Sequence, residues 1–208
     1  MTEIDVSPAR AHALSLLEAA LSRRAGLEEA SSASPFMALD PRQRGFARAL
    51  VLTTLRRLAT IDRALDAKLQ KPPPETVRNL LRLGAAQLWF MDTPDFAAVD
   101  TTVGLAAGRR DTRPFKNLVN AVLRALAREG APVDGPLAPD WLLARWRSAY
   151  GDAAARAIAE QIPREPPGIR RPSSASASID ASASGFSDRS VGGSRGICSA
   201  IARAAASP

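Results

Sequence analysis

The basic side chains are the groups in this sequence whose spacing most clearly indicates chemistry. Four of them, Arg109, Arg110, Arg113 and Lys116, lie within eight residues, and Arg124 follows from the body of the next predicted helix. A guanidinium can donate two parallel hydrogen bonds to a phosphate, so a cluster of this kind is typical of phosphate binding. The same residues also occur in solvated loops, and the sequence leaves both interpretations open.

The whole chain is basic, and nearly all of its positive charge is arginine. Its 208 residues carry 28 Lys+Arg against 21 Asp+Glu, and Lys68, Lys71 and Lys116 are the only lysines. Arginine binds phosphate and stacks on bases, which favours RNA as a partner, although a GC-rich genome would also raise the arginine content. The candidate RNA contacts are Arg10, Arg48, Arg56, Arg109, Arg110, Arg113, Lys116 and Arg124. On the second predicted helix, the alternative is that several arginines pair with acidic residues.

Groups suited to catalysis or metal binding are nearly absent. His12 and Cys198 are the only histidine and the only cysteine, which excludes a Cys/His zinc site and an internal disulfide framework. No phosphate-binding glycine-rich loop and no serine- or zinc-hydrolase motif occurs. His12 suits a solvated or structural position better than a titrating RNA contact, and Cys198 has no neighbouring base to activate it. The sequence therefore predicts no catalytic, cofactor-binding or metal-binding residue.

The elements that must position the basic residues are helices. Apolar residues recur at helical spacing as far as the paired prolines 166 and 167, which predicts an all-α class. A capping residue followed by proline marks three helix starts, at Ser7-Pro8, Asp40-Pro41 and Thr93-Pro94. The helix from Asp40 is expected to run through Leu58, and further helices are expected at residues 60–69, 75–90, 94–107 and 115–128. Gly84 lies inside one of them and costs about 1 kcal/mol relative to alanine, so we expect a close helix–helix approach there.

The remainder of the chain divides into a connector and a tail. Residues 141–150 bring two tryptophans and the only tyrosine together, which predicts a short helical hairpin. We expect Trp141, Trp146 and Tyr150 to pack in a core or an interdomain contact rather than to stack on RNA bases. Beyond Gly168 the composition of Ser, Ala, Gly and Arg predicts disorder, and a shifted reading frame would give a similar composition. The predicted organisation is a bundle over 1–130, a helical connector over 131–167 and a disordered tail over 168–208.

Targeting signals are not recognisable in this sequence. The N-terminus contains Glu3 and Asp5 and no apolar run, so we expect no signal peptide. No stretch reaches the roughly 18 apolar residues that a transmembrane helix requires. The expectation is a cytoplasmic protein without a membrane segment.

Three consecutive segments, residues 78–88 (RNLLRLGAAQL), 96–100 (FAAVD) and 117–124 (NLVNAVLR), resemble the signatures of the NusB-like domain. They look most like the version of that domain at the N-terminus of RsmB-type rRNA cytosine-C5 methyltransferases. Residues 45–51 (GFARALV) are similar to the second helix of that family, and residues 141–151 look like the connector that follows. Together the similar segments cover residues 7–167 in the right order.

The resemblance implies an all-helical bundle that binds RNA and assists recognition of 16S rRNA. Arg10 matches a basic position in the first helix of the family, and Asn120 and Arg124 belong to its N-x-V-L-R signature. We expect Asn120 to be a hydrogen-bonding residue within the bundle rather than an RNA contact.

The chain departs from those enzymes after the connector. There they continue into a doubly wound S-adenosylmethionine-binding domain with a glycine-rich loop and two functional cysteines, and none of these features occurs here. The resemblance therefore implies an RNA-binding module without catalysis of its own. Its expected partners are 16S rRNA and a methyltransferase domain, and S-adenosylmethionine is a cofactor of the parent family only.

Three alternatives remain open at this point. The chain could be a stand-alone transcription antitermination factor of the NusB kind, which the connector argues against, or a fragment of a complete methyltransferase. It could also be a protein-interaction scaffold that uses Trp141 and Trp146. For the RNA-binding hypothesis, replacing Arg109, Arg110 and Arg113 by alanine is expected to flatten the salt dependence of RNA affinity.

Overall fold

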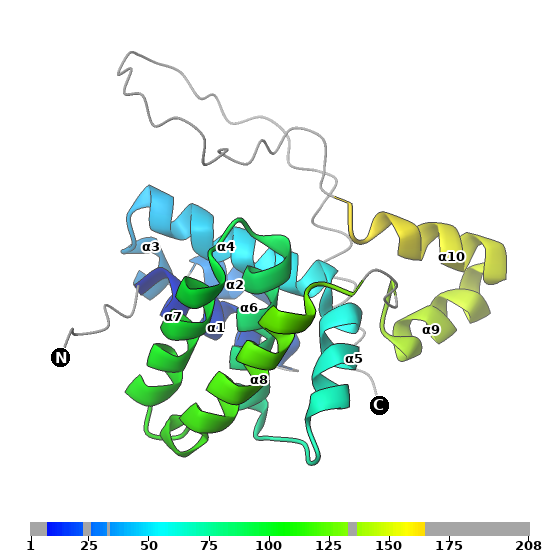
Figure 1. The fold of residues 1–208 in the computed structure, drawn as a ribbon. Coiled ribbons are helices and arrows are strands. Elements are labelled where there is room, and N and C mark those ends of the chain that lie inside the picture. Colours follow the sequence, from blue (N-terminus) through cyan, green and yellow to red (C-terminus); the bar gives the residue numbers. More distant parts are fainter. Residues whose placement is uncertain (1–7, 23–25, 33, 133–136, 165–208) are drawn as a thin grey trace.

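The computed structural model describes residues 8–22, 26–32, 34–132 and 137–164, and this part of the chain contains helices and no strand. The predicted all-α class is therefore confirmed for the described residues (Figure 1). The elements are α1 (Pro8–Leu21), α2 (Leu27–Ser32), α3 (Ser34–Met37), α4 (Pro41–Arg56), α5 (Leu58–Lys68), α6 (Glu75–Phe90), α7 (Asp95–Gly108), the 3-10 helix η1 (Arg113–Phe115), α8 (Lys116–Glu129), α9 (Asp140–Tyr150) and α10 (Asp152–Gln161).

The central helix of the bundle is α6. Every residue from Asn79 to Gln87 is buried, so this helix has no solvent-exposed face over more than two turns. α4, α5, α7 and α8 all pack on α6, and α1 packs on both α4 and α6 (Figure 1). A helix that is buried on all sides belongs to the interior of a bundle, and its neighbours supply one continuous hydrophobic core around it.

Gly84 lies where α6 meets α8. A Cβ atom at this position would lie 2.7 Å from both Cδ1 and Cδ2 of Leu123, closer than such atoms approach one another in proteins. Leu123 is fully buried, so its side chain fills the space that the missing Cβ leaves. The predicted close helix–helix approach at Gly84 is confirmed, and it offsets the weak helix propensity of glycine.

The start of α4 is set by its capping residue, as predicted. Asp40 Oδ1 accepts hydrogen bonds from the backbone N–H groups of Arg42 and Gln43 at 2.8 and 3.0 Å. The predicted end of this helix is wrong, because α4 ends at Arg56 and Leu58 belongs to α5. The intervening Arg57 turns the chain so that α4 and α5 both pack on α6, a requirement that the apolar pattern does not reveal.

Smaller differences occur at the ends of α7 and α8. Pro94 is the N-cap of α7, not its first helical residue, and the helix begins at Asp95 without a side-chain cap hydrogen bond. The predicted helix over 115–128 is observed as α8, which η1 precedes directly. These differences of a residue or so leave the order of the elements as predicted.

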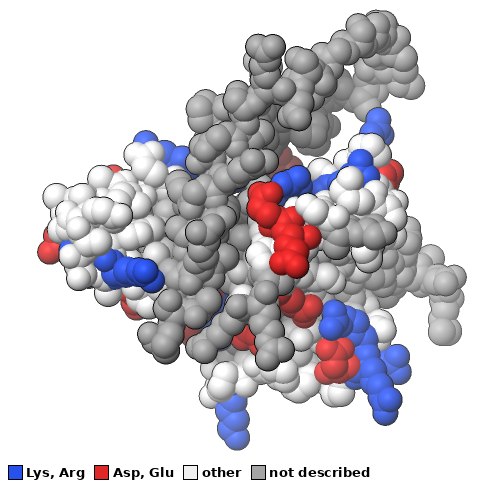
Figure 2. Space-filling view, turned by 180° about the vertical axis from the view of Figure 1, so that it is seen from behind, with Lys and Arg blue, Asp and Glu red and all other residues white. Residues whose placement is uncertain are grey.

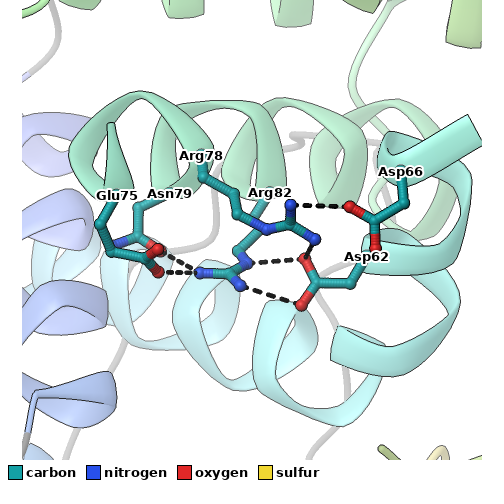
Figure 3. A network of polar contacts seen from close by, with 6 residues as sticks. All are labelled: Asp62, Asp66, Glu75, Arg78, Asn79 and Arg82. Carbon is teal, nitrogen blue, oxygen red and sulfur yellow. Dashed lines mark hydrogen bonds and ion pairs between the residues drawn. The ribbon is translucent and has the colours of Figure 1, made fainter. Parts of the chain in front are cut away.

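α5 and α6 are joined by a network of charged and amide side chains (Figure 3). Arg82 donates from Nε and Nη2 to both carboxylate oxygens of Asp62, at 2.8 and 2.9 Å. Its Nη1 donates to Glu75 at 2.5 Å and to the Asn79 side-chain oxygen at 2.7 Å. The other arginine of the network, Arg78, lies 3.3 Å from Asp62 and 2.7 Å from Asp66. Figure 3 shows both arginines pointing at α5.

The network fixes the protonation state of its arginines. Burial disfavours the charged guanidinium of Arg82, but the hydrogen bonds and charges of Asp62 and Glu75 outweigh it, and the pKa of Arg82 is raised. The hydrogen bond that Arg78 donates to Asp66 is the largest cause of the raised pKa of Arg78. Both arginines of the segment 78–88 therefore hold two helices together.

α9 and α10 form the predicted helical hairpin. They enclose a small hydrophobic cluster of Ala138, Leu142, Ala159 and Ile162, and Trp146 packs against it, as expected of a core position. Trp141 and Tyr150 differ from Trp146, because they are 41% and 64% exposed. For these two side chains an interdomain contact stays a prediction.

Some predictions fall outside the described residues. These are the cap at Ser7, the disordered tail over 168–208 and the surroundings of Cys198. The domain limits at residues 130 and 167 stay predictions. Within the described ranges, no helix combines the length and the apolar character that crossing a membrane requires.

Candidate nucleic-acid interface

The predicted basic cluster lies in the turn between α7 and α8, at one end of the bundle (Figure 1). α7 ends at Gly108, and the chain reaches α8 through η1. Thr112 is fully buried in this turn, and its hydroxyl donates a hydrogen bond to the Ala106 carbonyl at 2.8 Å. Because this bond closes the turn against the end of α7, the four basic residues are carried by a fixed backbone.

Arg109 is a cation whose charge is compensated, because carboxylates lie next to its guanidinium. Its Nε and Nη2 donate to the two carboxylate oxygens of Asp111 at 3.3 and 3.2 Å, and its Nη1 lies 3.8 Å from Glu18 Oε2 on α1. The hydrogen bonds that Arg109 donates to Asp111 raise the pKa of Arg109, and the same bonds lower the pKa of Asp111. To bind a phosphate, Arg109 would have to leave two carboxylates.

The other three members of the cluster, here called the turn cations, are Arg110, Arg113 and Lys116. All three are exposed. Arg113 donates from Nε to the Ala107 carbonyl at 3.1 Å, which fixes its side chain and leaves both Nη groups available. Within the described ranges, no carboxylate forms an ion pair with any of the turn cations. Three cations of one turn therefore carry charge that no neighbouring acid neutralises.

The exposed face of α8 continues from the turn cations. Val119, Val122, Leu123 and Leu126 form its buried face, and Arg124 projects from the opposite side. Arg124 donates from Nε to the side-chain oxygen of Asn120 at 3.0 Å. Asn120 is thus a hydrogen-bonding residue, as expected, but its partner is an exposed arginine on its own helix and not a group in the interior.

Arg10 has a different environment from the turn cations. It donates from Nε to Gln87 Oε1 on α6 at 2.7 Å, and its guanidinium lies 4.8 Å from the centre of the Phe46 ring on α4. Burial lowers the pKa of Arg10. These contacts join three helices, so Arg10 has a structural role, and its predicted RNA contact stays a prediction.

Arg48 and Arg56 lie on α4, and no ion pair joins either of them to another residue in the described part of the chain. The alternative that arginines of this region pair with acids is not observed for their neighbours either. Arg44 donates to the carbonyls of Met37 and Leu39 at 2.7 and 2.6 Å, and Arg57 lies 4.8 Å from the centre of the Phe90 ring.

The eight candidate residues do not form one patch. α7 begins a few residues after α6 ends and packs along it, so the turn after α7 lies at the opposite end of the bundle from Gln87 and its partner Arg10. Figure 2 shows the face behind that of Figure 1, where Lys and Arg side chains stand apart near the rim and acidic side chains lie close to several of them. The structure brings together the four residues of the turn and leaves Arg10 elsewhere.

One exposed cation on α8 was not among the candidates. Arg128 lies on the same exposed face as Arg124, and it forms no hydrogen bond or ion pair with a described residue. Its spacing could have revealed it, because residues 121, 124 and 128 lie on one side of a helix whose buried residues lie on the other.

The described ranges contain no group of three His, Cys, Asp or Glu side chains that could hold a metal ion. His12 is half-buried, and its Nδ1 lies 2.8 Å from the Pro8 carbonyl oxygen one turn earlier on α1. This position agrees with the solvated or structural role expected for it.

Comparison with known proteins matches this helical frame to a family. The model described as the NusB family matches residues 7–128, which contain α1 to α7 and all of α8 except its last residue. Among curated proteins, ribosomal RNA small subunit methyltransferase B of Thermus thermophilus is 42% identical over 132 residues, which are 62% of this chain and 31% of that protein. The enzyme of the same name from Xanthomonas campestris is 37% identical over 139 residues, 64% of this chain and 31% of that protein.

A third relative has a lower sequence identity to this chain. The probable ribosomal RNA small subunit methyltransferase B of Bacillus subtilis is 33% identical over 135 residues, 58% of this chain and 30% of that protein. The chain therefore spans about 31% of the length of the first two of these relatives.

Proposed function

This chain belongs to the NusB family, and from that premise we propose that it is the RNA-binding module of an rRNA cytosine-C5 methyltransferase. Its partner in this proposal is 16S rRNA, because the relatives are named as methyltransferases of small-subunit ribosomal RNA. The module positions the RNA through arginine–phosphate contacts at the turn between α7 and α8. A ribosomal RNA partner implies that the protein works in the cytoplasm.

The observation that carries this proposal is the uncompensated charge of the turn cations. Arg110, Arg113 and Lys116 are exposed on a turn that the buried hydroxyl of Thr112 holds in place. Contacts to phosphate depend on such cations, position the nucleic acid and carry little sequence information by themselves. The hydrogen bond from Arg113 Nε to the Ala107 carbonyl fixes one of the three guanidinium groups before any phosphate arrives, which lowers the entropy cost of binding.

In the same proposal, methyl transfer is the task of a separate domain. The matched part of the relatives is about 31% of their length, and we place the S-adenosylmethionine site and the catalytic groups in the remainder of such an enzyme. The NusB-family part then binds and orients the substrate RNA for a methyltransferase domain, in the same polypeptide or as a partner.

The test is RNA binding as a function of salt. The full chain is titrated against a 16S rRNA fragment and a scrambled RNA of equal length, at several salt concentrations. The variant Arg110→Ala/Arg113→Ala/Lys116→Ala is expected to lower the slope of log affinity against log salt by about 2, because each phosphate contact on a single strand contributes about 0.7.

A matched control removes the same number of charges elsewhere. Arg63, Arg145 and Arg156 are exposed arginines on α5, α9 and α10 that form no ion pair with a described residue. Their replacement by alanine is expected to leave the slope nearly unchanged. An equal fall in both triple variants would refute the turn as the site, and equal affinity of the wild type for both RNAs would refute preference for rRNA.

A further inference from the structure

The exposed face of α8 carries cations without acids. Lys116, Arg124 and Arg128 lie on it, and the first acidic residue of the helix is its last residue, Glu129. Glu129 forms an ion pair with Lys68 of α5, so its charge is already compensated. Solvated helix faces usually mix both signs of charge, and a face with only cations and amides is instead suited to a polyanion.

Arg124 is the cation on this face whose side chain is held by another side chain. Its Nε donates to Asn120 Oδ1 at 3.0 Å, one helical turn away. A guanidinium has five N–H donors in one plane, so a bond at Nε fixes that plane and leaves four donors on the two Nη groups. Asn120 is half-buried, which restricts its own side chain, and as a neutral acceptor it orients the arginine without cancelling its charge.

Two other arginines with fixed side chains are held by acids instead of by an amide. Arg109 is held by the carboxylates of Asp111 and Glu18, and Arg82 is held by those of Asp62 and Glu75. In both cases the acceptor is a carboxylate, which neutralises the positive charge that would attract a phosphate. Among these three, only Arg124 is both oriented and uncompensated.

We propose that Asn120 is a positioning residue that orients Arg124 to bind a backbone phosphate of the RNA, so that the RNA path extends from the turn cations along the exposed face of α8. Lys116 and Arg124 are eight residues apart, about 12 Å along the helix axis, which puts them on different phosphates. This inference rests on the proposed RNA-binding function and adds a second group of contacts to it.

The experiment compares five variants of the full chain, including a control and a double variant, in the same salt titration with the 16S rRNA fragment. Arg124→Ala is expected to weaken binding about tenfold and to lower the salt slope by about 0.7, the contribution of one phosphate contact. Asn120→Ala is expected to weaken binding about fivefold with an unchanged slope, because the contact still forms but an unrestrained side chain must first be ordered. Asn120→Asp is expected to behave like Arg124→Ala, since a carboxylate would neutralise the arginine.

Asn117→Ala is the matched control. Asn117 has the same chemistry, lies on the same helix and holds no arginine, so its replacement is expected to change affinity less than twofold. Asn120→Ala combined with Arg124→Ala should bind no more weakly than Arg124→Ala alone, because a positioning residue has nothing left to position.

Several outcomes would overturn the inference. These are an additive double variant, an effect of Asn120→Ala no larger than that of Asn117→Ala, or a salt slope that falls with Asn120→Ala. Circular dichroism of each variant separates these results from loss of folding. If the wild type does not bind the RNA, the proposed function has failed; if the turn variant weakens binding and the α8 variants do not, only the positioning role of Asn120 has failed.

Discussion

Arg82→Met tests whether the network between α5 and α6 stabilises the bundle. Arg82 is 9% exposed in its side chain and forms two hydrogen bonds with Asp62, at 2.8 and 2.9 Å. Removing one partner of a buried ion pair costs about 3–5 kcal/mol, because the other partner stays buried and charged. Here Asp62 is 24% exposed and keeps Arg78 at 3.3 Å, so we expect the lower end of that range, about 3 kcal/mol.

The assay is urea unfolding of the full chain, followed by far-UV circular dichroism. With an m value of about 2 kcal/mol per molar urea, a loss of 3 kcal/mol lowers the midpoint by about 1.5 M. Arg78→Met is the matched control, because its closest partner Asp66 is 62% exposed and exposed ion pairs contribute about 0.2–1 kcal/mol. We expect Arg78→Met to cost about 1 kcal/mol.

A double variant isolates the pair itself. Replacing both charges, in Asp62→Leu/Arg82→Met, is expected to cost about 2 kcal/mol less than the sum of the two single changes, because no unpaired charge then remains between the helices. If the effects add within about 0.5 kcal/mol, or if Arg82→Met costs no more than Arg78→Met, the reasoning about burial and charge in this network is wrong.

Three further predictions follow from the packing and from the turn. Gly84→Ala is expected to lower the free energy of unfolding by about 1–2 kcal/mol in the same urea assay, because crowding of Leu123 exceeds the gain in helix propensity. Gly45→Ala has no atom within 4 Å of the added Cβ and should instead stabilise by about 0.5–1 kcal/mol; equal effects would contradict the close approach. Asp111→Asn is expected to tighten RNA binding about threefold by releasing Arg109, and fluorescence anisotropy showing weaker binding would refute this. Arg109 lowers the pKa of Asp111, so the contribution of this pair to stability is present above the ordinary carboxyl pKa and lost as the pH falls through the lowered value. Thermal unfolding of wild type and Asp111→Asn should therefore converge in acid, and a gap that widens there would contradict the assignment.

Much of the helical frame could be predicted from local sequence. Asp40 is followed by a proline and by two backbone N–H groups within reach of its carboxylate, so the start of α4 follows from neighbouring residues alone. The bounds of α6 agree with prediction because its apolar residues recur over more than four turns. By contrast, α2 and α3 were not predicted, because helices of six and four residues are too short to show a period.

The candidate site could be predicted only in outline. The four basic residues between α7 and α8 are close in sequence, so they remain together in any fold that ends a helix at Gly108. The sequence did not show which of these four cations would be paired with an acid, because one of the two acids that pair with Arg109 lies on α1, far away in the chain. The role of Asn120 was predicted correctly as a hydrogen bond and wrongly as an interior one, since both kinds of position share the same spacing.

The sequence by itself determined the helical class and the order of the long helices, since these depend on residues a few positions apart. It marked Gly84 as a point of close approach, but the partner there, Leu123 of α8, follows only from the tertiary packing. Only the tertiary structure decided which arginines are available to a phosphate. Arg10 is joined to Gln87, 77 residues away, and Arg82 to Asp62, 20 residues away. Because the free energy of a charge depends on its burial and on its nearest opposite charge, and both are created by packing, identical side chains became structural in one place and available in another.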